Sequence, residues 1–142
     1  MRLQVMRLRV MRLRVMSLRD DEGSAIAEFV MVAGLLTVLT LSVIQLALAL
    51  HIRNTVIDAA AEGARYAALA DSGLPDGVAR TRDLITVAIG AAYARDVTAS
   101  YGSYLGHPAA QVTVRTPLPL IGLVGIDDGL EVTGHAAVET LD

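Results

Sequence analysis

The chain contains no cysteine and no tryptophan, and phenylalanine occurs once. Without cysteine, neither a disulfide nor a thiolate-bound metal can hold the fold together, although this absence does not exclude a location outside the cytoplasm. Because aromatic side chains are scarce and alanine and valine are abundant, any core must be built from small aliphatic side chains. The chain has three histidines, His51, His107 and His135. They are isolated in the sequence and lack the spacing of metal ligands, so we expect no metal and no cofactor.

Lysine is also missing, and all 12 basic residues are arginine, which we interpret as a compositional bias of the genome. Half of them lie at the start of the chain: Arg2, Arg7, Arg9, Arg12, Arg14 and Arg19. The remainder is therefore acidic and has no basic stripe, which argues against nucleic-acid binding. No arrangement of Ser, His and Asp has catalytic spacing, so we assign no catalytic residue and expect no enzymatic activity.

Formal charge is absent from residues 29–50. A helix rises about 1.5 Å per residue, so this run makes a helix of about 33 Å, enough to cross a bilayer core. The positive-inside rule then places the arginine-rich N-terminus in the cytoplasm and everything beyond Leu50 outside. A second apolar segment, Pro117–Ile126, is too interrupted by Pro and Gly to be another span.

An acidic residue, Glu28, immediately precedes this run. A carboxylate near the centre of a membrane costs about 2.5 kcal/mol or more, so Glu28 requires a partner. A junction of two small residues, Gly23 and Ser24, lies shortly before it. This order of charged leader, Gly23, four residues, Glu28, Phe29 and apolar helix resembles the processing site of type IV pilin-like proteins.

The resemblance implies a function for each residue of this junction. A membrane-embedded prepilin-type peptidase would cut between Gly23 and Ser24 on the cytoplasmic side. Glu28 would become the fifth residue of the mature chain and pair with the terminal amine of a neighbouring subunit. In an alternative reading of the same resemblance, the peptidase recognises Glu28 and Phe29.

The leader repeats one pentad three times, over residues 1–5, 6–10 and 11–15. One interpretation is a basic segment that touches anionic lipid before processing, and its alternating pattern would also fit a strand. The interpretation that we favour is a duplicated start region, because residues 16–23 already form a sufficient leader. The true start then lies among Met1, Met6, Met11 and Met16.

Beyond the apolar run, the helical pattern continues without proline to about Ala70. It places five side chains on one apolar face: Ile52, Val56, Ala60, Ala64 and Ala67. Gly63 costs about 1 kcal/mol relative to alanine in a helix interior, so we expect a neighbouring element to approach closely there. The breaker cluster Asp71–Pro75 ends this helix, and a second helix is predicted from about Asp76 to Ala94.

After Arg95 the pattern changes to a period of two residues. Three strands are predicted, over Val97–Tyr101, Gln111–Arg115 and Leu130–Glu139. They would form a small antiparallel sheet packed on the distal half of the long helix, which makes the fold class α+β. Residues 127–129 are expected to form a turn rather than a calcium site. We expect Pro117–Ile126 to be a loop, either resting on the membrane or a partner subunit or buried against the long helix.

The segment Ala59–Ala68 contains Glu62, Gly63, Ala64 and Arg65 and resembles the Glu-Gly-Ala-Arg segment of TadE-like proteins. These are minor pseudopilins of tight-adherence (Flp-type) pilus systems, and residues 113–120 and the last strand also look like that family. The resemblance implies a cleaved cytoplasmic leader (1–23), a transmembrane helix (24–50) and an extracytoplasmic head (51–142). It further implies a single-pass protein of the cytoplasmic membrane, incorporated in a surface pilus or retained in the membrane. The implied partners are a prepilin-type peptidase, other pilins or pseudopilins, the pilus assembly platform and membrane lipid.

Other classes of protein also fit the sequence. The chain would be an unprocessed membrane anchor that carries an extracytoplasmic binding module, or a secreted protein with a signal peptide cut near Ala49. A tethered extracytoplasmic enzyme is a weaker alternative, because no catalytic site is evident. The N-terminal residue of the mature protein distinguishes the first two alternatives from the pseudopilin.

Overall fold

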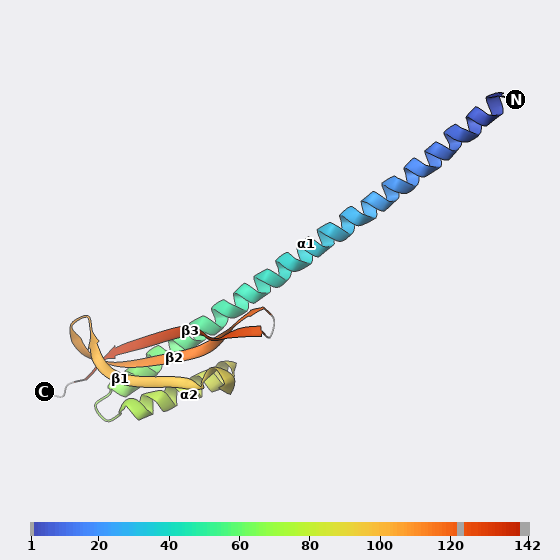
Figure 1. The fold of residues 1–142 in the computed structure, drawn as a ribbon. Helices are drawn as coiled ribbons and strands as arrows, with labels where there is room; N and C mark the ends of the chain where they lie inside the picture. Colours follow the sequence, from blue (N-terminus) through green and yellow to red (C-terminus); the bar gives the residue numbers. More distant parts are fainter. Residues whose placement is uncertain (1, 122–123, 140–142) are drawn as a thin grey trace. The chain divides into compact units, whose positions relative to one another are not determined.

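The computed structural model describes the backbone of residues 2–121 and 124–139 and the side chains of residues 23–118 and 129–139. The chain divides into two compact units, Met1–Val43 and Ile44–Asp142. Helix α1 (Arg2–Ala68) forms the described part of the first unit and extends into the second. The second unit also contains helix α2 (Leu74–Ile89), a short 3-10 turn (Ala91–Tyr93), and strands β1 (Asp96–Tyr104), β2 (His107–Ile121) and β3 (Val124–Ala137), as Figure 1 shows.

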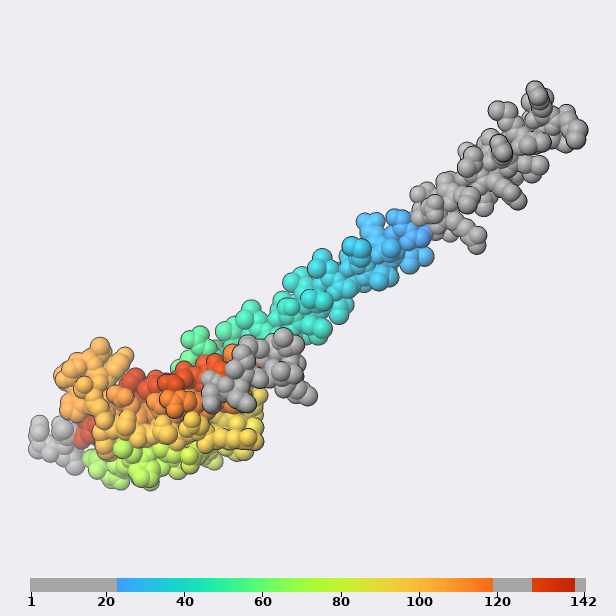
Figure 2. Space-filling view, viewed as in Figure 1, coloured from blue at the N-terminus to red at the C-terminus, as the bar shows by residue number. Residues whose placement is uncertain are grey.

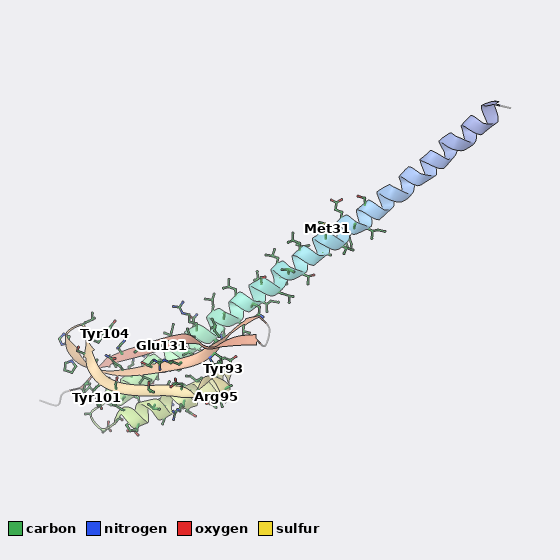
Figure 3. All side chains as sticks on the ribbon, in the orientation of Figure 1. Met31, Tyr93, Arg95, Tyr101, Tyr104 and Glu131 are labelled. Carbon is green, nitrogen blue, oxygen red and sulfur yellow. The ribbon has the colours of Figure 1, made fainter. Side chains whose placement is uncertain are left out.

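Helix α1 confirms the predicted long helix, and it begins within the leader rather than at Ser24. No proline interrupts the chain before Pro75, and a single glycine such as Gly23 weakens a helix without ending it. From residue 23 onward the helix is long and apolar enough to cross a membrane, with a mean hydropathy of 2.3 in its most apolar stretch. None of that stretch is buried within the chain, and side chains such as Met31 stand out from the helix (Figure 3).

The hydroxyl groups in the apolar part of α1 need no partner outside the helix. Thr37, Thr40 and Ser42 each donate a hydrogen bond of 2.8 Å to the carbonyl oxygen four residues earlier. This local bonding removes the penalty for placing a hydroxyl in an apolar environment. These residues are therefore compatible with a helix that faces lipid.

Helix α2 is shorter than predicted at its C-terminal end. At its start, the Asp76 carboxylate accepts a 2.9 Å hydrogen bond from the Gly73 backbone N–H. At its end, Gly90 adopts a φ of 107°, and its N–H bonds back to the carbonyls of Ile85 and Thr86. Only glycine adopts such a backbone readily, so the helix stops at Ile89 and not at Ala94.

The three strands form one antiparallel sheet in the order β1-β2-β3. The sheet itself was predicted, but its strands are longer, and the predicted loop Pro117–Ile126 is wrong. Most of that segment belongs to the end of β2 and the start of β3, and residues 127–129 lie inside β3 instead of forming a turn.

Proline is tolerated in β2 because of its position in the sheet. The pairing of β2 with β1 ends at Arg115, so the rest of β2 has a strand on one side only. One register shift, between Thr116 and Leu118, contains Pro117, and a second begins directly after Pro119, which itself pairs with Gly125. Whether this region touches lipid, a partner or α1 depends on side chains 119–128, which lie outside the described part.

The core of the second unit confirms the predicted apolar face of α1. Ile52, Val56 and Ala60 of α1 pack together with Ile85 of α2 and with valines of the sheet. The opposite face of the sheet is polar, where Thr113 and Thr133 form a 3.0 Å hydroxyl pair and Arg115 bonds Glu131 at 2.7 Å. One face of the sheet is thus covered by helices and the other is open.

Candidate functional site

The junction predicted for processing lies in the first unit, on a helical and exposed stretch of α1. Gly23, Ser24, Glu28 and Phe29 are all exposed. A Cβ added at Gly23 would meet no atom within 4 Å, and the backbone there is ordinary helix. Neither packing nor conformation therefore requires glycine at position 23 in the folded chain.

Glu28 stands without an ion-pair or hydrogen-bond partner in the part of the chain whose side chains the structure describes. Among the described side chains, none forms a hydrogen bond or ion pair with its carboxylate. The carboxylate lies one residue before an uncharged apolar helix, where leaving a charge unpaired is costly. The described side chains therefore leave this carboxylate available to a group of another molecule or to a newly created chain end.

Glycine at position 63 has the close neighbour that the sequence predicted. A Cβ at Gly63 would collide with the Thr81 hydroxyl of α2 and lie 2.7 Å from the Gly77 carbonyl oxygen. A Cβ at Gly77 would lie 2.6 Å from both the Gly63 oxygen and the Ala67 Cβ. The two helices thus touch backbone to backbone, and the contact requires glycine on both.

The Thr81 side chain bonds the two helices at this contact. It is fully buried, and its hydroxyl lies 2.9 Å from the Gly77 oxygen and 3.3 Å from the Ala59 oxygen of α1. Sequence reasoning missed this residue, because a single threonine among solvated residues of α2 has no distinctive pattern. Gly77, which lies in the first turns of a predicted helix, was the one available signal.

Replacing Thr81 by valine preserves the side-chain volume and removes both hydrogen bonds. We expect a loss of about 1–2 kcal/mol in the free energy of unfolding. Urea unfolding in detergent, followed by tyrosine fluorescence, measures it, because all four tyrosines lie in the second unit and tryptophan is absent. Thr86 is exposed on the same helix, so Thr86→Val should change stability by less than about 0.5 kcal/mol.

The segment that resembled the TadE-like family divides into buried and exposed parts. Gly63 and Ala64 are buried in the second unit. Glu62 and Arg65 form an ion pair of 3.6 Å, with 44% and 71% of their side chains exposed. Such a surface pair adds little stability, so the charges of this segment are not explained by folding.

These two charged residues line an open groove of about 560 Å³ between α1 and α2. Its other charged residues are Asp58 of α1 and Arg80 of α2, and its apolar wall includes Leu84. Carboxylates and guanidinium groups are balanced, so the groove selects no ligand of one charge. Within the described residues, no cluster of His, Cys, Asp and Glu is arranged to hold a metal ion.

Comparison with known proteins finds a match for part of helix α1. Residues 23–65 match the family model described as TadE-like protein. The match begins at Gly23 and ends at Arg65, so it contains the whole junction and the Glu-Gly-Ala-Arg segment, whereas the strands lie outside it. No curated protein and no solved structure matches the chain. The match confirms the predicted resemblance to TadE-like proteins over residues 23–65 of this chain.

Proposed function

We propose that the protein is a minor pseudopilin that is processed by a prepilin-type peptidase and acts in the assembly of a tight-adherence pilus. The TadE-like family suggests an association with this class of pilus. The observation that carries the proposal is Gly23, a glycine that neither packing nor backbone conformation requires. It lies where the charged leader meets the apolar helix, five residues before Glu28, which has no partner among the described side chains.

In this proposal the chain has no catalytic role and needs no cofactor. The leader (1–23) is cytoplasmic and is removed, residues 24–50 cross the cytoplasmic membrane, and residues 51–142 form the extracytoplasmic head. The partners are the peptidase, other pilins or pseudopilins, the assembly platform and membrane lipid. Glu28 pairs with the terminal amine that cleavage creates on a neighbouring subunit.

The mature N-terminus tests the proposal. We expect N-terminal sequencing of the membrane-extracted protein to begin at Ser24. The Gly23→Leu variant should retain its leader, because a prepilin-type site needs a small residue before the cut, whereas Gly34→Leu should be processed normally. Gly34 is the matched control, since a Cβ there also meets no atom within 4 Å.

Two other results would each reject the proposal in favour of a different class of protein. An intact leader in the wild-type protein would indicate an unprocessed anchor that displays a binding module. A terminus at Leu50 with a soluble product would indicate a conventional signal peptide cut after Ala49. The same experiment therefore separates the three classes.

A further inference from the structure

The turn between β1 and β2 combines a strained backbone with an exposed apolar side chain. Tyr104 pairs with His107, and the two residues between them, Leu105 and Gly106, have φ values of 52° and 83°. Two consecutive residues with positive φ make a type I′ hairpin turn, which strongly favours Asn, Asp or Gly at its first position. Leucine there carries a steric penalty that these residues avoid or reduce.

The fold does not use the Leu105 side chain. The Leu105 side chain is 83% exposed, more than any other large apolar side chain in the described part of the chain. An unfavourable residue that contributes nothing to the turn or to the core indicates a function outside the chain.

Two tyrosines extend the apolar surface behind the turn. Tyr101 is 57% and Tyr104 is 49% exposed. They are separated by an odd number of positions along β1, so they lie on opposite faces of the sheet, and Figure 3 shows them on its two sides. The Tyr104 ring stacks on His135 of β3, with ring centres 4.4 Å apart and planes 9° apart, so it is held in place. The hairpin thus presents apolar groups at its end and on both faces.

Formal charge is absent from the part of the hairpin that adjoins the turn. Residues 97–114 contain no Asp, Glu, Lys or Arg, and the next charged residues along the two strands, Asp96 and Arg115, lie opposite each other at the far end of the ladder. Outside the hairpin, the exposed Glu139 follows Val138, whose N–H donates to the Pro108 oxygen. Leu105 lies at the turn and the two tyrosines lie behind it along β1, with the polar Ser103 and His107 close to the turn as well. This order matches the interface of a bilayer, where aliphatic groups insert most deeply and tyrosine lies at the headgroup level.

Within the second unit, the hairpin lies beside the C-terminal end of α1. The Ala68 oxygen accepts a hydrogen bond from Glu139, and the Pro108 oxygen accepts one from Val138, so the last turn of α1 lies beside the base of the hairpin. Ile44 and Ala68 are separated by about 36 Å of helix. In Figure 2 the hairpin, in orange, stands out from the end of this unit.

We propose that the β1–β2 hairpin inserts into the interface of a second lipid bilayer, with Leu105 deepest and Tyr101 and Tyr104 at the headgroups. A protein pocket fits the same surface less well, because protein interfaces surround an apolar centre with a polar rim, and this part of the hairpin supplies no charged rim. One leucine and two tyrosines bind weakly, so several copies must act together for stable attachment. This proposal does not depend on cleavage at Gly23.

The test uses the full chain in phosphatidylcholine proteoliposomes, mixed with labelled protein-free phosphatidylcholine vesicles. We expect the wild-type protein to tether these vesicles. Leu105→Asn should weaken tethering about tenfold or more, the effect of losing one buried leucine. Val87 is 82% exposed on α2, and Val87→Asn should leave tethering unchanged. Because the part of the hairpin that adjoins the turn has no charge, adding phosphatidylglycerol or salt should change tethering less than twofold.

A tryptophan at position 105 locates the contact, because the chain has no other tryptophan. Fluorescence of Leu105→Trp should shift to the blue and be quenched when brominated lipid is present in the added vesicles only. Asparagine suits the turn better than leucine, so Leu105→Asn should fold at least as stably, and its loss of tethering cannot be a loss of folding. Four results would overturn the proposal: full tethering by Leu105→Asn, tethering only with anionic lipid, quenching only by the protein's own bilayer, or no vesicle binding at all.

Discussion

The Gly134→Ala variant is expected to lose a large part of the stability of the second unit. Gly134 lies where β3 crosses α1, and an added Cβ would collide with the backbone carbonyl group of Ala60 and lie 2.6 Å from the backbone nitrogen of Ala61. Real Cβ atoms essentially never come within 3.0 Å of another heavy atom. Because all three neighbouring atoms belong to a helix backbone, no side-chain rotation relieves the contact.

The strand must therefore move away from the helix, and the core opens with it. Overpacking a core costs about 1–3 kcal/mol and occasionally more, and here the whole crossing is displaced, so we expect at least about 3 kcal/mol. A small domain has about 5–15 kcal/mol in total, so a loss of this size leaves it marginal. Gly63→Ala should cost less, because the Thr81 side chain can rotate away and only the Gly77 oxygen resists.

Urea unfolding in detergent, followed by tyrosine fluorescence, measures this loss. Gly73→Ala is the matched control, because its Cβ would meet only ordinary contacts, the nearest being the Pro75 Cδ at 3.6 Å. We expect that variant to stay within about 1 kcal/mol of the wild type. Equal stability of Gly134→Ala and Gly73→Ala would mean that β3 does not pack on α1 at this point.

The long helix and its packing face could be predicted because both are properties of local sequence. An uncharged run of this length admits few structures other than a helix, and the apolar period of the residues that follow selects one face. The strand ends could not be predicted, because glycine and proline were interpreted as breakers. Gly102 instead lies within β1, where an added Cβ would lie 2.7 Å from the amide nitrogen of the flexible Gln111 side chain. Pro117 is tolerated because its strand has lost one neighbour.

Some residues of the candidate site could also be predicted from local sequence, whereas others depend on three-dimensional packing. The junction at Gly23 and Glu28 follows from charge and spacing along one helix, so the sequence was sufficient to propose it. The close approach at Gly63 was predicted, but its partners Gly77 and Thr81 were not, since a crossing of two helices depends on three-dimensional packing. The hairpin turn was missed because Leu-Gly lacks the Asn-Gly or Asp-Gly signal of a type I′ turn.

The Glu28→Ala variant is expected to insert into the membrane normally and to assemble poorly. Removing a carboxylate from the border of an apolar helix favours insertion, so the amount of membrane-extracted protein should not fall. If Glu28 pairs with the terminal amine of a neighbour inside the membrane, the variant leaves that amine unpaired. Breaking a buried ion pair in this way costs about 3–5 kcal/mol, which corresponds to association weakened by more than about 100-fold.

Two measurements on the same variant separate pairing from recognition by the peptidase. Pili are counted on cells by electron microscopy, and the N-terminus of the membrane-bound protein is sequenced. A terminus at Ser24 together with few pili supports pairing, whereas a retained leader assigns Glu28 to peptidase recognition. Glu28→Gln keeps the side-chain shape without the charge, so pairing predicts that it assembles as poorly as Glu28→Ala. Asp83→Ala, which removes an exposed carboxylate from α2, should form pili at the wild-type level, and normal piliation by Glu28→Ala would exclude the pairing role.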